Sequence, residues 1–137
     1  MVLVSACLAG ERCRYDGACM PHTAVVALVE SGEAVAVCPE VLGGLPTPRV
    51  PSERVGERVV NREGADVSSS FFAGAERALE ICRNRGCTEA ILKSRSPSCG
   101  CGQIYDGSFS GKLIVGNGVF ADLLLAHDIP VRTEEDL

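Results

Sequence analysis

The chain has 137 residues, a formal net charge of −5 and a hydrophobic fraction of 46%. This length is typical of one domain with a sizeable core, so we expect a single domain over residues 1–137. The acidic balance argues against a nucleic-acid partner, because such proteins usually carry a basic face. No run of about 18 apolar residues is present, so we expect no membrane span or membrane partner.

The first half of the chain predicts a strand, a helix and a second strand. Residues 2–6 are a short apolar run that is typical of a buried strand. Pro21 fits the first turn of a helix, which Gly32 ends. Residues 34–37 are apolar without alternation, so both faces of this second strand should be buried. The long segment 41–67 is rich in Pro and Gly, and we expect a functional loop that contains a small valine hairpin.

The second half begins with the clearest helix of the chain. Apolar residues at helical spacing predict it from Ser68 or Ser69 to Gly86. A third buried strand follows at residues 89–92, and it runs into a loop rich in Ser, Gly and Cys. The remaining predicted elements are two short extended segments (104–107 and 112–115), a helix (119–126), a strand (129–131) and a solvated acidic tail.

This order of elements predicts an α/β fold. Apolar strands that alternate with helices are typical of a small parallel sheet with helices on both faces, which is a three-layer arrangement. The right-handed crossover rule leaves few topologies. We expect a flavodoxin-like or Rossmann-like sheet with the strand order 2-1-3-4.

Eight cysteines are many for a chain of this length. A secreted disulfide scaffold is one interpretation, but such scaffolds are short and have small cores. Residues 1–5 lack the basic start of a signal peptide, so we expect a cytoplasmic protein. In a reducing compartment, surplus cysteines are either buried apolar residues or metal ligands.

Three of the cysteines follow predicted strands. Cys7 follows the first strand, Cys38 follows the second, and Cys99 lies in the loop after the third. The carboxyl ends of parallel strands share one edge of the sheet, so these thiols should converge there. They could hold an iron–sulfur cluster or a zinc ion, stay inert in the core, or carry out thiol redox chemistry. A fourth ligand could come from Cys13, Cys19 or Cys101.

Polar residues near the same edge are candidates for catalysis and substrate binding. Glu40 follows Cys38 by two residues and is a candidate general base. Ser96 and Ser98 could donate hydrogen bonds to a substrate or to a cluster, although serines in such loops often serve only the turn. Arg49 could bind an anionic or carbonyl group of a substrate. Each of these residues could equally be a structural or solvated side chain.

Four separated motifs resemble those of the thiouracil desulfidase (TudS) family of short bacterial and archaeal proteins. They are Val4-Ser5-Ala6-Cys7-Leu8, then Arg14-Tyr15-Asp16-Gly17, then Cys38-Pro39-Glu40 together with Leu42 to Arg49, and then Ser94 to Gly100. The likeness extends to Ile104-Tyr105-Asp106-Gly107 and Phe109 to Lys112. It therefore runs almost from end to end of the chain.

The resemblance implies a [4Fe-4S] cluster held by Cys7, Cys38 and Cys99, with one iron not ligated by the protein. It also implies that Glu40 and Ser96 are catalytic. The implied reaction is a non-redox desulfuration of a small thiocarbonyl compound, such as 2-thiouracil, to the oxo compound with release of sulfide. The alternative is a non-catalytic iron–sulfur or zinc module that acts as a sensor or binds a partner. The chain would act as a monomer or a homodimer.

Overall fold

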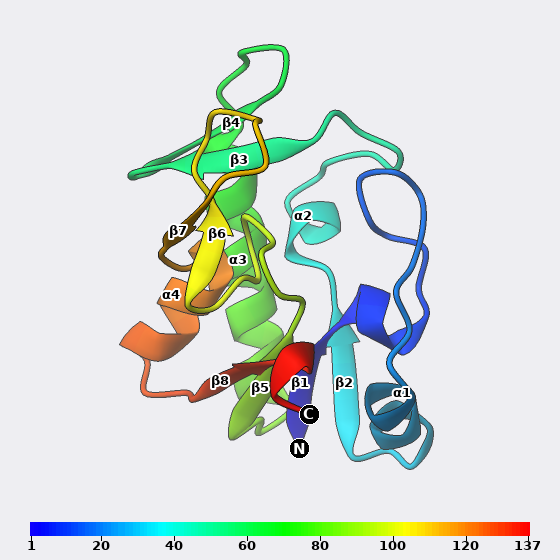
Figure 1. The fold of residues 1–137 in the computed structure, drawn as a ribbon. Helices are drawn as coiled ribbons and strands as arrows, with labels where there is room; N and C mark the ends of the chain where they lie inside the picture. The colour runs from blue at the N-terminus through cyan, green and yellow to red at the C-terminus, as the bar shows by residue number, and fades with distance from the viewer.

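The computed structural model describes residues 1–137 as a small α/β fold (Figure 1). Its elements in chain order are β1 (Val2–Ser5), η1 (Ala6–Ala9), α1 (Thr23–Glu30), β2 (Ala34–Val37), α2 (Pro39–Leu42), β3 (Ser52–Val55), β4 (Arg58–Asn61), α3 (Ser68–Asn84), β5 (Glu89–Leu92), β6 (Gln103–Tyr105), β7 (Leu113–Val115), α4 (Val119–Ala126), β8 (Val131–Thr133) and η2 (Glu134–Asp136). None of its helices has the length and apolar character needed to cross a bilayer.

The four main strands form one parallel sheet in the order β2-β1-β5-β8. Counted along the chain, this is the predicted order 2-1-3-4, which is confirmed. In the register, Val2 pairs with Ala34 on one side and with Glu89 on the other. Two antiparallel hairpins, β3–β4 and β6–β7, stand apart from the sheet near the ends of its strands (Figure 1).

The core lies on both faces of the sheet. Leu3 packs in a large cluster with α3 and α4, and Val4, the next residue, packs on the other face with α1 and η1. Alternate side chains of a strand point to opposite faces, so an apolar run without alternation fills both layers. The predicted burial of both strand faces and the three-layer architecture are therefore confirmed.

Helix α2 is a single turn that the sequence did not predict. Pro39 occupies its first turn, where the missing N–H costs nothing, and Gly43 follows its last residue. It packs against α3 almost backbone to backbone, because a Cβ on Gly74 would lie 1.8 Å from the carbonyl oxygen of Pro39. This contact fixes the place of α2 over the carboxyl end of β2.

The start of one helix and the capping of another differ from the prediction. Helix α1 begins at Thr23, and Pro21 lies before it, because His22 is the N-cap and its Nδ1 accepts a hydrogen bond from the Ala24 N–H at 3.2 Å. Helix α3 does begin at Ser68, but the side chain of Ser68 bonds the backbone of Val59 and does not cap the helix.

The C-terminal segment departs furthest from the prediction. The last strand is β8 at residues 131–133, two residues later than predicted, because its register with β5 pairs Leu92 with Thr133. The acidic tail is not simply solvated. Glu134 accepts hydrogen bonds from Lys93 and Ser94 with both carboxylate oxygens, so η2 is docked against the loop after β5.

Candidate active site

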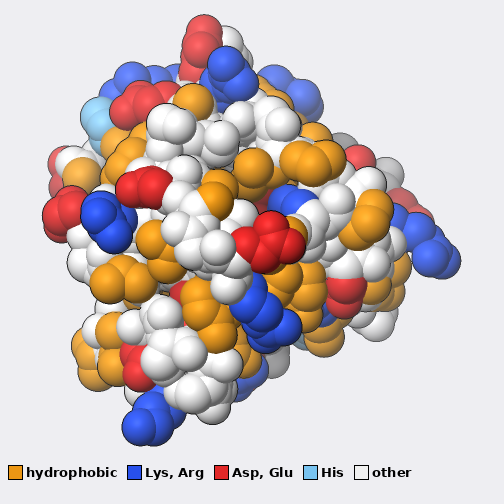
Figure 2. Space-filling model, turned by 90° about the horizontal axis from the view of Figure 1, so that it is seen from above, with side chains coloured by type: hydrophobic (Ala, Val, Ile, Leu, Met, Phe, Trp, Pro, Cys, Tyr) orange, Lys and Arg blue, Asp and Glu red, His pale blue; other side chains and the backbone are white.

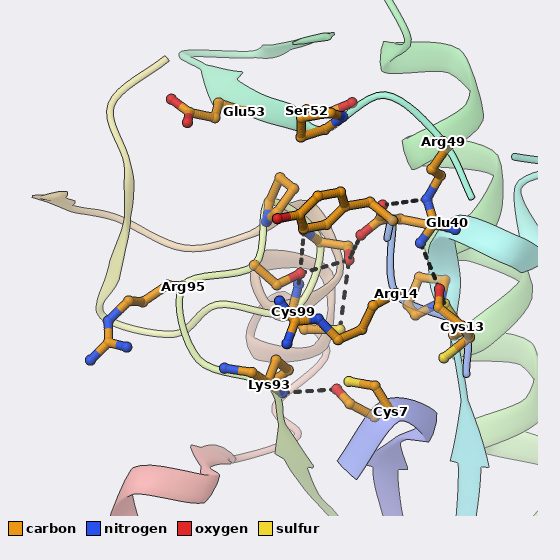
Figure 3. Close-up of a pocket in the computed structure, with 18 of the residues that line it drawn as sticks. Cys7, Cys13, Arg14, Glu40, Arg49, Ser52, Glu53, Lys93, Arg95 and Cys99 are labelled. Carbon is orange, nitrogen blue, oxygen red and sulfur yellow. Dashed lines mark hydrogen bonds and ion pairs between the residues drawn. The ribbon is translucent and has the colours of Figure 1, made fainter. Parts of the chain in front are cut away.

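A cavity of about 380 Å³ lies at the carboxyl ends of β1, β2 and β5. In an open α/β sheet this edge is where ligands bind, at the point where the strand order reverses. Figure 3 shows the cavity with Cys7, Cys13 and Cys99 around its lower part and Ser52 and Glu53 across the top. Figure 2 views the molecule from this end, where acidic and basic side chains lie close together among hydrophobic ones.

The structure brings the three strand-end cysteines to this one cavity. Cys7 lies in η1 directly after β1, Cys38 is the N-cap of α2, and Cys99 lies in the loop after β5. All three are free thiols, and Cys7 and Cys99 are nearly enclosed. The sheet therefore brings the thiols of three cysteines that are far apart in the sequence to one cavity.

Burial and neighbouring groups give the three thiols different acidities. Burial raises the pKa of Cys7 to about 11 and that of Cys99 to about 12. A hydrogen bond with the Cys13 side chain, aided by the backbone N–H of Val41, lowers the pKa of Cys38 below its ordinary value. A thiol binds a metal as thiolate, so binding at Cys7 and Cys99 would have to displace their protons.

Cys13 is a fourth thiol in the cavity. It contacts Cys38, and this hydrogen bond together with burial raises the pKa of Cys13. The other cysteines lie elsewhere. Cys101 turns toward β8, with its sulfur 3.9 Å from the carbonyl oxygen of Val131, and Cys82 is fully buried in the core, as predicted. Of the alternative fourth ligands suggested by the sequence, only Cys13 lines the cavity.

The set of thiols fits a cluster better than a single ion. No three Cys, His, Asp or Glu side chains are close enough together to share one metal ion. A four-iron cluster is wider than an ion, so its thiolate ligands stand apart around it. Soft thiolates without a nearby histidine are the donors that such clusters use.

Glu40 reaches the cavity from α2 and is held by two partners. Arg49 Nε donates to Glu40 Oε1 at 3.1 Å, and Ser98 Oγ donates to Glu40 Oε2 at 3.1 Å. The Glu40 side chain is 15% exposed and that of Arg49 is 6% exposed. A carboxylate that accepts two such bonds is held in one orientation and still has lone pairs left for a water molecule.

The guanidinium of Arg49 donates hydrogen bonds to four other groups of the protein. Besides Glu40, the guanidinium donates to the carbonyl oxygens of Cys13 and Pro46 and to the Thr47 hydroxyl. It thus ties the loop after α2 to the loop after η1, across the cavity from Cys99. Through these contacts Arg49 fixes the position of Glu40.

Ser96 and Ser98 link the cysteine loop to Glu40. Ser96 Oγ accepts the N–H groups of Ser98 and Cys99, and it lies 3.0 Å from Ser98 Oγ. With its acceptor sites filled, Ser96 is left to donate to Ser98, which in turn donates to Glu40. The N–H groups of Phe120 and Ala121 in the first turn of α4 donate to the carbonyl oxygen of Ser98 and hold this loop in place.

Sequence reasoning missed the aromatic and basic side chains of the cavity. Tyr15, Tyr105 and Phe109 line it, together with Arg14 and Arg62. The available signal is the triplet Tyr-Asp-Gly, which occurs at residues 15–17 and again at 105–107, although its composition is that of an ordinary turn. Both copies place their tyrosine in the wall of the same cavity.

Comparison with known proteins gives one consistent result. A family model described as 2-thiouracil desulfurase matches residues 2–136. The uncharacterized protein YbbK of Bacillus subtilis (strain 168) is 41% identical over 147 residues, an alignment that covers 100% of this chain and 97% of that protein. The solved structure of a [4Fe-4S]-dependent thiouracil desulfidase, TudS, superposes with a TM-score of 0.94 at 48% identity and covers 99% of this chain and 91% of the other. The chain therefore belongs to the 2-thiouracil desulfurase family.

Proposed function

We propose that this protein is an iron–sulfur-dependent desulfidase for small thiocarbonyl compounds such as 2-thiouracil. The overall reaction is hydrolytic: the thiocarbonyl compound and water give the oxo compound and hydrogen sulfide, with no net oxidation or reduction. The observation that carries the proposal is the placement of Glu40, held by Arg49 and Ser98 in the cavity that the three strand-end thiols and Cys13 line.

Cys7, Cys38 and Cys99 would hold a [4Fe-4S] cluster and leave one iron without a protein ligand. When bound, the cluster supplies a soft Lewis acid for the thiocarbonyl sulfur of the substrate. The solved TudS structure, described as [4Fe-4S]-dependent, supports the cluster, and the shared cavity of the three strand-end thiols supports the choice of ligands.

The remaining steps belong to side chains of this chain. Glu40 accepts a proton from the water that adds to the thiocarbonyl carbon, acting as a general base. Ser98 keeps Glu40 Oε2 oriented, and Ser96 orients Ser98. Arg49, which the sequence suggested as a substrate-binding residue, acts here mainly as the residue that positions Glu40.

A non-catalytic iron–sulfur or zinc module is the competing function. A sensor needs no base beside its metal, whereas here a carboxylate is held in the cavity by an ion pair and a serine hydroxyl. The oriented carboxylate therefore favours the enzyme over the non-catalytic module.

The test is reconstitution without oxygen. We expect a brown protein with about four irons per chain that releases sulfide from 2-thiouracil and forms uracil in equal amount. The protein without iron is the matched control and should release none. A protein that holds the full cluster but converts no thiocarbonyl compound would support the non-catalytic module, and a colourless protein with one zinc would exclude the cluster.

A further inference from the structure

The few aromatic residues of this chain are concentrated at the cavity. The chain has two Tyr, four Phe and no Trp. Three of these rings, Tyr15, Tyr105 and Phe109, line the cavity, while Phe71 and Phe120 are buried in the core. Half of the aromatic rings in this mainly aliphatic protein therefore line one cavity, where they offer flat apolar surfaces to a ligand.

An arginine guanidinium lies over each of two rings in the cavity wall. The Arg14 guanidinium lies 5.9 Å from the centroid of Tyr15, and that of Arg62 lies 5.7 Å from the centroid of Phe109. These are the two cation–π pairs of the protein, and all four residues line the cavity. A cation covers one face of each ring, so the other face remains for a ligand.

The backbone around Phe109 is built to hold that ring in place. Phe109 has φ +56°, a left-handed conformation that a bulky residue rarely adopts and that often marks a functional site. One carboxylate oxygen, Glu53 Oε1, accepts the N–H groups of Gly107 at 2.9 Å and Phe109 at 3.1 Å. Glu53 thereby fixes the loop between β6 and β7 against β3.

Tyr15 is held from the other side of the cavity. Its carbonyl oxygen accepts the N–H of Arg49 at 2.7 Å, so its loop is tied to the segment that positions Glu40. Tyr15 as a residue is 41% exposed, although this backbone contact anchors its loop. In Figure 1 the loop of Tyr15, between η1 and α1, rises beside β2, whereas the loop of Phe109 rises on the side of β5.

We propose that Tyr15 and Phe109 are specificity-determining residues that stack on the ring of the substrate. The cavity would then select planar heteroaromatic thiocarbonyl compounds over acyclic thioamides. This inference rests on the proposed function and adds to it the residues that recognise the ring of the substrate. Stacking of a base on an aromatic side chain changes binding by about 5- to 150-fold when the side chain is removed.

The test uses holoenzyme prepared without oxygen and two readouts. The first is the affinity for uracil, measured by calorimetry, because uracil has the ring but no sulfur to bind iron. The second is the pair kcat and KM for 2-thiouracil, compared with kcat/KM for thioacetamide, an acyclic thioamide. Iron content and melting temperature are measured on each variant, so that a folding or cluster defect is recognised.

Tyr15→Leu and Phe109→Leu should each weaken uracil binding and raise KM for 2-thiouracil by about tenfold or more. Their kcat/KM for thioacetamide should fall by a much smaller factor than their kcat/KM for 2-thiouracil. Tyr15→Phe keeps the ring and should behave like the unsubstituted protein. Phe72→Leu removes an exposed ring that lies outside the cavity and is the matched control for Phe109→Leu.

Two results would overturn the inference. One is an unchanged uracil affinity and KM in both leucine variants. The other is an equal loss for thioacetamide and 2-thiouracil, which would show a general defect of the site. If the unsubstituted protein released sulfide from neither compound, the proposed function would fail, but uracil affinity in the variants would still decide whether the rings stack on a base.

Discussion

At the scale of single residues, the site depends on what holds each functional side chain. Glu40 has one oxygen on Arg49 and the other on Ser98, so its carboxylate cannot rotate freely. Ser98 is buried, and its partner Ser96 is itself fixed by two backbone N–H groups. A general base that is oriented before substrate binds loses little entropy during the reaction.

Substitution of Glu40 separates its chemical role from a structural one. Glu40→Gln keeps the shape and can still accept a hydrogen bond from Ser98, but it cannot take a proton from water. We expect sulfide release from 2-thiouracil to fall by about 10²-fold or more with the iron content unchanged. Sulfide and iron are assayed on the same sample. Full activity would remove Glu40 from the mechanism, and loss of iron would make it structural.

The five cysteine variants test which thiols hold iron. We expect Cys7→Ser, Cys38→Ser and Cys99→Ser each to lose the cluster after anaerobic reconstitution, because these thiols line the cavity. Cys82→Ser and Cys87→Ser are the controls and should keep about four irons, since one lies inside α3 and the other follows it. Iron analysis and absorbance give the result. A folded Cys82 or Cys87 variant without iron would contradict the assignment.

At the scale of elements, short turns carry the site and longer elements support them. Cys7 lies in a four-residue 3-10 turn, and Cys38 and Glu40 lie at the start of a one-turn helix. Such turns are too short to be stable alone. The close contact of α2 with α3 at Gly43 and Gly74 supplies the support, because neither backbone leaves room for a side chain between them.

Gly74→Ala should therefore destabilise the fold, although alanine is the better helix former. The new Cβ would lie 1.8 Å from the carbonyl oxygen of Pro39, so α2 would have to move away from α3. Overpacking of this kind costs about 1–3 kcal/mol. The exposed substitution Glu76→Ala on the same helix should change stability by less than about 0.5 kcal/mol. Urea unfolding compares the two, and a Gly74→Ala protein of unchanged stability would show that α2 is free to shift.

At the scale of the whole molecule, the last residues of the chain support the cysteine loop. Glu134 accepts the N–H of Ser94 at 2.6 Å and the Nζ of Lys93 at 3.1 Å, and its side chain is 15% exposed. Lys93 in turn donates its own N–H to Ser5 of β1. The two ends of the chain thus meet at β5, directly before the loop that carries Cys99.

The Glu134 contacts make part of the stability depend on pH. Burial alone would raise the pKa of Glu134, but hydrogen bonds from Ser94 and Lys93 outweigh it and lower the pKa below its ordinary value of 4.5. Because the pKa of Glu134 is lower in the folded state, its contribution to the free energy of unfolding is fully present above pH 4.5. This contribution is lost as the pH falls through the pKa of Glu134 in the folded protein. Glu134→Gln should cost about 1–3 kcal/mol at neutral pH, and this difference should shrink below pH 4.5.

Unfolding curves measured at several pH values check this expectation. Glu135→Gln is the matched control, because its ion pair with Arg95 is exposed and should contribute less than about 1 kcal/mol. A difference between Glu134→Gln and the unsubstituted protein that did not vary between pH 7 and pH 3 would contradict the role of the Glu134 carboxylate.

The sheet and the edge at which the thiols lie could be predicted from the sequence. Apolar runs without alternation at residues 2–6, 34–37 and 89–92 can only be buried on both faces, and this requirement selects parallel strands between helix layers. Once the strands are parallel, the residues that follow them must share one edge. Cys7, Cys38 and Cys99 could therefore be brought together from local patterns alone.

How the other side chains pair around those thiols depends on the folded structure. The bond of Ser98 to Glu40 and the docking of Glu134 on Ser94 join residues that are 58 and 40 positions apart, and no local periodicity encodes such a contact. Likewise, the two Tyr-Asp-Gly triplets have the composition of ordinary turns, and their tyrosines meet at one cavity because the packed sheet and hairpins bring their loops there. Hydrophobic patterning determines which face of an element is buried, whereas polar partners depend on the final geometry of the loops.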